Sequence, residues 1–319
     1  MAKPGMVSNR TVSGKKTSYG SMLLKDFKKN HLIYLMGLPV LAYYLIFHYG
    51  PMYGVIIAFK NFSPGRGILG SSWVGFQWFQ DFFNSYYFGR LLRNTLLINI
   101  LNLIFSFPAP IILALLLNEL RSQKFKKTVQ TISYMPHFIS LVVICGMIHD
   151  FTARDGVIND IIAWFGGEPD TMLLRPELFR PIYIISGIWQ GIGWGSIIYL
   201  AALSGIDPEL YQASLIDGAN RWDQVWHITL PGIMPTIVIL LILRIGSMMS
   251  VGHEKIILLY NASTYETADV ISSFVYRKGL LEANYSYSAA VGLFNSVINF
   301  ILIITANWIS RNVNETSLW

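Results

Sequence analysis

The sequence is short of charge. Lys and Arg number 24 and Asp and Glu 18, so that charged residues make up 13% of the 319-residue chain, whereas hydrophobic residues make up 53%. A soluble domain of this size carries about 25% charged residues. This chain therefore has too few to cover a water-facing surface, and its composition predicts an integral membrane protein with several spans.

Several chemistries lack the residues that they need. Cys145 is the single cysteine, which excludes a disulfide framework and a multi-cysteine zinc site. The six histidines are scattered, and His253-Glu254 does not continue into H-E-x-x-H, so we expect no metal site. Gly14-Lys15-Lys16-Thr17 lacks the upstream glycine of a G-x-x-x-x-G-K-[ST] phosphate loop. The chain therefore cannot hydrolyse ATP by itself.

Long apolar stretches are present, and a membrane span needs about 20 such residues. The stretches that qualify are Leu32–Ala58, Thr95–Leu117, Ile132–Ile148, Ile182–Leu203, Ile233–Val251 and Ala289–Ile309. The third is the weakest, because Pro136, His137 and Ser140 make it short and slightly polar. We expect an all-α membrane protein with six transmembrane helices. The first stretch has no small-residue cleavage site after it, which favours an uncleaved anchor.

Basic residues gather in two segments, the N-terminal one and the loop Asn118–Gln130. They are Lys3, Arg10, Lys15, Lys16, Lys25, Lys28, Lys29, Arg121, Lys124, Lys126 and Lys127. Because cytoplasmic loops carry an excess of Lys and Arg, both segments are predicted to be cytoplasmic. Six spans then place both termini in the cytoplasm. Such a basic membrane face suits anionic lipid better than nucleic acid.

This pattern divides the chain into a basic cytoplasmic segment, 1–31, and a six-span domain, 32–319. The loops on the opposite side, 59–94, 149–181 and 252–288, are nearly neutral and rich in aromatic residues. Their composition favours an ordered cap. No convincing internal repeat is present, which disfavours a transporter built from two inverted halves.

The loop between spans four and five, 204–232, contains several helix signals. Asp207-Pro208 is typical of a helix start, and Gly218 of a helix end in a left-handed conformation. A second short helix is predicted over Arg221–His227, after which Pro231 turns the chain into span five. The small, polar tip Asp217–Arg221 would suit a groove in another protein. The alternative is an interfacial hairpin that only joins two spans.

Three segments of this loop carry a resemblance to a known family. Gln212-Ala213-Ser214, Asp217-Gly218-Ala219 and Ile228-x-Leu230-Pro231 resemble the EAA loop of ABC-importer permeases, with matching spacing throughout. Gln212 replaces the family's Glu and Ser214 its second Ala, so the role of that Glu is not carried over. Segments such as Tyr134–Ser140 are similar to the LplB-type branch, which implies import of polysaccharide fragments or complex oligosaccharides.

The resemblance implies a type I importer permease with the MetI-like fold, in which each part of the machine has its own subunit. A second, similar permease would complete the pathway, and two cytosolic ATPases would bind ATP and Mg²⁺, so this chain itself needs no cofactor. An extracellular lipid-anchored or periplasmic binding protein would deliver the sugar. By the same resemblance the residues that couple to the ATPases are Gln212, Ala213, Ser214, Asp217, Gly218, Ala219, Asn220 and Arg221.

Polar and aromatic side chains within the spans are candidates for the sugar pathway. They are Trp189, Gln190, Trp194, Tyr199, Arg244, Asn295 and Asn299. A charged side chain in the membrane is costly and usually faces a cavity or a partner. Arg244 would therefore suit an acidic sugar such as a uronate, or an acid on the second permease. The tryptophans could pack against helices or lipid, and the asparagines, four residues apart on one face, could tie helices together.

Two other functions stay open at this point. A permease for amino acids or phosphate would share the loop and the spans. A membrane-embedded acyl- or glycosyltransferase would need carboxylates or histidines clustered at one membrane face, and the acidic residues here are dispersed over the loops. Span four contains a repeated G-x-x-x-G motif formed by Gly187, Gly191 and Gly195, which lets another helix approach closely.

Overall fold

The computed structural model describes residues 26–314 and 317–318, and these residues are almost entirely helical. The expected basic residues Lys3, Arg10, Lys15, Lys16 and Lys25 lie outside them. The chain divides into two compact units, one ending at Val55 and the other beginning at Ile56. Each unit is described by itself.

The first unit contains most of the expected first span. A single helical stretch runs over His31–Phe59, close to the expected Leu32–Ala58. It consists of α2 (His31–Tyr44), a π-helical turn (Leu45–Tyr49), α3 (Gly50–Met52) and a 3₁₀ segment (Tyr53–Phe59) that continues into the second unit. Pro51 at the start of α3 falls at the position where a missing N–H is tolerated.

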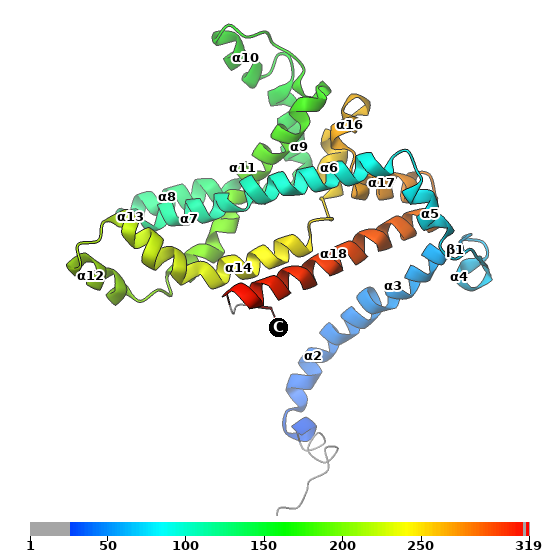
Figure 1. The fold of residues 1–319 in the computed structure, drawn as a ribbon, viewed down its shortest axis with the longest axis horizontal. Coiled ribbons are helices and arrows are strands. Elements are labelled where there is room, and N and C mark those ends of the chain that lie inside the picture. The colour runs from blue at the N-terminus through cyan, green and yellow to red at the C-terminus, as the bar shows by residue number, and fades with distance from the viewer. Residues whose placement is uncertain (1–25, 315–316, 319) are drawn as a thin grey trace, which may run out of the picture. The chain divides into compact units, whose positions relative to one another are not determined.

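Four long helical stretches of the second unit also qualify as spans in the described residues. They are Phe88–Asn118, made of α6 (Phe88–Leu101), a π turn (Asn102–Ser106) and α7 (Pro108–Asn118); α11 (Pro176–Leu203); Arg221–Gly246; and Tyr285–Asn312 of α18 (Tyr285–Asn314). Each starts before the expected apolar stretch, because polar residues extend the helices beyond the apolar core of the span. Figure 1 shows α14 and α18 running side by side.

The third expected span, Ile132–Ile148, is not one straight helix. Two helical pieces, Gln123–Phe138 and Leu141–Trp164, meet at an angle of 99°. They comprise α8 (Gln123–Tyr134), a 3₁₀ turn (Met135–Phe138), α9 (Leu141–Thr152) and α10 (Val157–Trp164). The break has a local cause: Ile139 and Ser140 are extended, and the Ser140 hydroxyl accepts the Val143 N–H as the cap of α9 (3.4 Å).

The second short helix predicted over Arg221–His227 does not end before span five. Arg221–Gly246 is one hydrogen-bonded helical stretch, formed by α13 (Arg221–Gln224), a π-helical turn (Val225–Thr229) and α14 (Leu230–Gly246), and it changes direction between α13 and α14, near Pro231 (Figure 1). Proline normally breaks a helix because it lacks an N–H and clashes with the carbonyl four residues earlier. Here the π turn widens the helix just ahead of Pro231, and the Leu230 N–H reaches back five residues to the Val225 carbonyl.

Helix α11 is the centre of the second unit and packs against α7, α8 and α14. Small residues permit this packing. A Cβ on Gly195 would lie 2.9 Å from Pro110 of α7, and one on Gly193 would lie 2.1 Å from the Ser133 carbonyl oxygen of α8. The close approach expected of the G-x-x-x-G pattern is confirmed at Gly195, whereas a Cβ on Gly191 would meet no atom within 4 Å.

The remaining elements are short and connect the spans. They are a two-stranded antiparallel sheet of β1 (Lys60–Asn61) and β2 (Ser72–Trp73), α4 (Gly67–Gly70), α5 (Gln77–Phe83), α12 (Pro208–Ile216), α15 (His253–Leu259), α16 (Tyr265–Ala268) and α17 (Ile271–Tyr276), with 3₁₀ turns at Met172–Leu174 and Ala262–Thr264 and a π turn at Arg277–Leu281.

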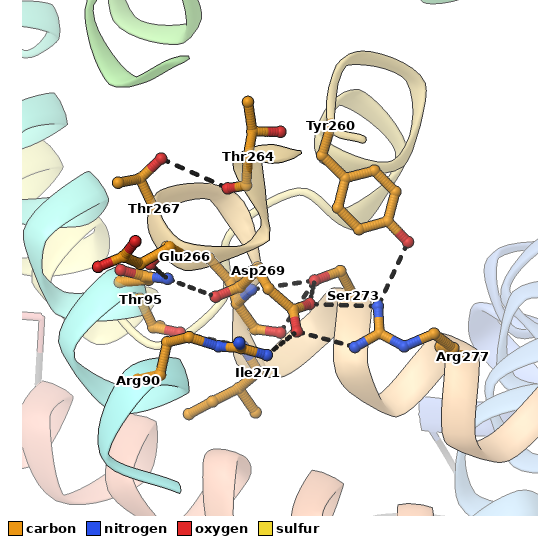
Figure 2. A network of polar contacts seen from close by, with 12 residues as sticks. Arg90, Thr95, Tyr260, Thr264, Glu266, Thr267, Asp269, Ile271, Ser273 and Arg277 are labelled. Carbon is orange, nitrogen blue, oxygen red and sulfur yellow. Dashed lines mark hydrogen bonds and ion pairs between the residues drawn. The ribbon is translucent and has the colours of Figure 1, made fainter. Parts of the chain in front are cut away.

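A buried carboxylate organises the segment between α14 and α18 (Figure 2). Asp269 is fully buried and pairs with Arg90 of α6 (3.3 Å) and with Arg277 (2.8 Å). The Ser273 hydroxyl donates to the same carboxylate (2.8 Å), and the Asn94 amide donates to the Asp269 carbonyl oxygen (2.9 Å). This region is therefore an ordered, cross-linked cap, as its composition indicated.

Candidate functional site

Helix α12 begins and ends as its sequence predicts. The Asp207 carboxylate accepts the Glu209 N–H (2.9 Å) as an N-cap, with Pro208 in the first turn. Gly218 has φ = +81°, which confirms its left-handed conformation. The Ala219 N–H donates to the Ser214 carbonyl (2.9 Å) and the Gly218 N–H to the Leu215 carbonyl (3.2 Å). This pair of bonds closes the helix with a Schellman motif.

The hairpin formed by α12 and α13 (residues 207–224) is held together by its own polar side chains. Asn220 caps α13 in a capping box with Asp223. The Gln224 amide donates to the Ser214 hydroxyl (3.0 Å), and Tyr211 shares a hydrogen bond with Thr229 (3.0 Å). Ser214, where the chain departs from the family pattern, thus links the two arms of the hairpin.

The outer face of this hairpin is exposed and partly apolar. Gln212, Ala213, Asp217 and Gly218 are exposed, and a Cβ on Gly218 would meet nothing within 4 Å. Beside them Ile216 is 88% exposed. Leu210 and Leu215 of the same helix are also exposed, at 53% and 64%, and exposed apolar side chains gathered in this way mark a surface that contacts protein or membrane. Arg221 is exposed as well and pairs with Glu119 (3.2 Å).

A cavity of about 620 Å³ lies between the spans, and three of the sequence-predicted residues line it: Gln190, Tyr199 and Arg244. Its walls come from α6, α7, α11 and α14 and from the segment that leads into α15. The lining residues are Asn99, Asn102, Ser106, Phe107, Pro110, Tyr183, Gly187, Ile188, Gln190, Gly191, Ile192, Gly195, Ile198, Tyr199, Leu240, Leu243, Arg244, Ser247, Ser250, Val251, Gly252 and Lys255.

The other predicted pathway residues lie elsewhere. Trp189 faces a separate apolar pocket, and Trp194 stacks on His137 with 4.5 Å between ring centroids. Asn299 ties α18 to the end of α14, accepting the Met249 N–H and donating to the Ser250 hydroxyl, each at 2.8 Å. Asn295 lines a different pocket of about 490 Å³. The structure therefore groups Gln190, Tyr199 and Arg244 and separates them from these four.

Sequence reasoning missed Lys255, which is 8% exposed in the cavity wall. Its ammonium donates to the Tyr183 carbonyl (3.1 Å) and lies 4.8 Å from the centre of the Tyr183 ring. Burial lowers the pKa of Lys255 to about 8, because the charged form loses its hydration. One feature of the sequence could have indicated its burial: Lys255 lies four residues before Leu259, which is buried, so both fall on the apolar face of α15.

A polar stripe on span two was missed as well. Asn99, Asn102 and Ser106 recur at helical spacing and face the cavity. Ser106 donates to the Asn102 side-chain oxygen (3.0 Å), and Asn102 donates to the Ile98 carbonyl (3.0 Å). Within the described residues, no group of three or more His, Cys, Asp or Glu could hold a metal ion. The cavity thus offers hydrogen bonds and aromatic rings to a ligand.

Several spans around a polar cavity, with a protruding hairpin at the end of one span, define a membrane transport subunit. Residues 86–315 match the model of the binding-protein-dependent transport system inner membrane component family. This chain belongs to that family, whose fold is MetI-like, and it is a transport subunit and not an enzyme.

Relatives similar over nearly the whole chain include two from Bacillus subtilis (strain 168). Protein LplB is 46% identical over 301 residues, which are 94% of this chain and 95% of LplB. The polygalacturonan/rhamnogalacturonan transport system permease protein YteP is also 46% identical, over 96% of this chain and 95% of its own length.

Among solved structures, a chain of a bacterial alginate ABC transporter is similar to this one. That transporter was crystallised in complex with a periplasmic protein bound to an alginate pentasaccharide. The TM-score is 0.86 at 45% sequence identity, and the match covers 93% of this chain and 99% of the other. A second crystal structure, of a transporter that imports the acidic polysaccharide alginate, gives a TM-score of 0.85 at 46% identity.

Proposed function

We propose that this chain is a permease subunit of an ATP-driven importer of oligosaccharides. The cavity carries the proposal: it opens between the spans and combines amides, hydroxyls and aromatic rings within about 620 Å³. Pockets of this size are typical of small-molecule sites. More than 90% of the chain is similar to a polygalacturonan/rhamnogalacturonan transport permease and to a chain of an alginate ABC transporter, which supports the same class of cargo.

The partners are those that the family implies. Two cytosolic ATPase subunits would bind ATP and Mg²⁺, which agrees with the lack of a phosphate loop in this sequence. A second permease would close the other side of the pathway, and an extracellular binding protein would deliver the sugar. The chain would lie in the bacterial plasma membrane with both termini in the cytoplasm, as its basic residues favour.

The α12–α13 hairpin would be the contact with the ATPases. Its tip, Asp217–Arg221, stands where a partner can reach it, and exposed Ile216 beside it would be covered by docking. Closure of the ATPases on ATP would pull the hairpin and switch the spans between inward- and outward-facing states. Transport would thus proceed by alternating access, with the sugar released from the cavity at each cycle.

The test is uptake and ATPase activity of the assembled transporter in liposomes, with binding protein and a panel of plant and algal oligosaccharides. We expect sugar-stimulated ATPase activity in the wild type and loss of the stimulation in Gly218→Trp. The matched control is Gly166→Trp. Gly166 has the same φ of +81° and equally open surroundings, but it follows α10, far along the chain from the hairpin.

Two outcomes would contradict the proposal. If no sugar stimulates the wild-type complex while phosphate or amino acids do, the cargo is wrong. If Gly218→Trp and Gly166→Trp lower the activity equally, the effect is backbone strain and the hairpin is not the coupling element.

A further inference from the structure

Two cationic side chains reach the same cavity from different elements. Arg244 comes from the last turns of α14 and Lys255 from the first turn of α15. The Lys255 ammonium lies over the ring of Tyr183, which lines the cavity together with Arg244. The cavity therefore carries two cationic side chains.

These cations are not neutralised within the described part of the chain. No Asp or Glu of that part lines the cavity, and Arg244 takes part in none of its ion pairs. The Lys255 ammonium donates a hydrogen bond to a neutral carbonyl and lies over a neutral ring, both of Tyr183. Arg244 lies within a candidate span, where an unpaired charge is costly and marks a substrate path or a partner. By contrast, the arginines beside Asp269 have a buried carboxylate as their partner.

The rest of the lining specifies the kind of anion. Asn99, Asn102, Ser106 and Gln190 can exchange hydrogen bonds with hydroxyl groups, and Tyr199 adds a ring. A small inorganic anion would use the cations alone. It would leave unused the second N–H of Asn99 and of Asn102, whose first N–H donates to the Thr95 and Ile98 carbonyls. A sugar ring that carries both hydroxyls and a carboxylate would use both sets.

We propose that Arg244 and Lys255 form a carboxylate-binding site in the cavity, which selects uronate-containing oligosaccharides over neutral ones. The inference rests on the proposed function as an oligosaccharide permease. Arg244 provides a planar fork that matches a carboxylate, whereas Lys255 provides a point charge held in place by Tyr183. The alternative occupant of Arg244, an acid on the second permease, is an outcome of the test.

The experiment measures binding to the assembled transporter in nanodiscs, without binding protein, so that the selectivity of the permease itself is observed. The probes are trigalacturonate and its methyl ester, which have the same rings and differ in charge. The variants are Arg244→Met, Arg244→Lys and Lys255→Met, with Lys124→Met as the control. Lys124 is an exposed cation of α8 that does not line the cavity.

We expect the wild type to bind the acid at least tenfold more tightly than the ester. Losing a charged hydrogen-bond donor costs about 1.5–3 kcal/mol, so Arg244→Met and Lys255→Met should each weaken acid binding about tenfold or more and leave the ester within about twofold. Arg244→Lys should retain part of the preference, and Lys124→Met all of it. Lys255 is buried and bonded to Tyr183, whereas Arg244 is exposed. If Lys255→Met does not fold, the Arg244 variants therefore still decide the test.

The two proposals fail in different ways. Equal wild-type affinity for acid and ester, or equal loss for both in Arg244→Met, would overturn the carboxylate site and leave the oligosaccharide permease intact. Loss of the second permease from the complex in Arg244→Met, with an unchanged preference for the acid, would assign Arg244 to the subunit interface. Binding of neither probe, together with no sugar-stimulated ATPase activity, would overturn the proposed function itself.

Discussion

Arg221, the first residue of α13, pairs with Glu119, which directly follows α7, with 3.2 Å between Nη1 and Oε2. The pair connects the α12–α13 hairpin to the helix whose Pro110 lines the cavity. It therefore holds the hairpin against the C-terminal end of α7.

We expect this pair to serve coupling more than stability. Its side chains are 57% and 38% exposed, and ion pairs so exposed contribute within about 1 kcal/mol. Glu119→Gln and Arg221→Gln should each lower the sugar transported per ATP hydrolysed and hardly change the melting temperature. The charge swap Glu119→Arg/Arg221→Glu should recover part of the coupling. If the swapped variant transports no more sugar per ATP than the single variants, the ion pair does not couple ATP hydrolysis to transport.

Asp269→Asn is expected to destabilise the fold strongly. The change leaves Arg90 and Arg277 without the carboxylate that they share, and breaking a buried ion pair costs about 3–5 kcal/mol. The control is Asp170→Asn, which breaks the exposed pair with Arg175 and should cost less than about 1 kcal/mol. Thermal unfolding in detergent measures both. Similar losses in the two variants would contradict the organising role of Asp269.

Gly193 should tolerate no side chain. A Cβ there would lie 2.1 Å from the backbone oxygen of Ser133, so Gly193→Ala must push α8 away from α11. Overpacking costs about 1–3 kcal/mol, and a contact with backbone belongs at the upper end. Gly191→Ala is the matched change one half-turn away, with nothing within 4 Å, and should be neutral or slightly stabilising. If the two variants have equal melting temperatures, α11 and α8 are not in close contact.

The free energy of unfolding should depend on pH above neutrality because of Lys255. Burial lowers its folded pKa to about 8, whereas an unfolded lysine titrates near 10.4. The unfolded chain therefore binds more protons between these values, and stability rises as pH increases from about 8 to about 10. Melting temperatures of the wild type and Lys255→Met at pH 7.5, 8.5 and 9.5 test this. The melting temperature of the wild type should rise relative to that of Lys255→Met as the pH increases across the series. An equal change of melting temperature in both proteins would contradict the prediction.

Local chemistry made part of this structure predictable. Asp207 and Gly218 begin and end α12 because a carboxylate cap and a left-handed glycine act within one turn. The end of the helix predicted over Arg221–His227 is wrong for the same local reason. Proline usually breaks a helix, but the preceding π turn accommodates Pro231, and no residue pattern in Val225–Thr229 predicts a π turn.

The cavity was harder to predict because it depends on how each helix is rotated. Trp189 and Gln190 are neighbours in sequence, yet only Gln190 lines the cavity. The orientation of α11 is determined by its close contact with α8 at Gly193, which lies outside the G-x-x-x-G pattern. Lys255 was overlooked since a single lysine beside apolar residues is ordinary in sequence and becomes distinctive only when its neighbours in space are known.

The continuous helical stretch Arg221–Gly246 has a mechanical consequence. Arg221 at the hairpin and Arg244 at the cavity belong to this one stretch, and no loop lies between them. The stretch changes direction between α13 and α14, where the π turn precedes Pro231 (Figure 1). A displacement of the hairpin therefore reaches Arg244 through a bend, and the stiffness of that bend determines how much of the displacement arrives.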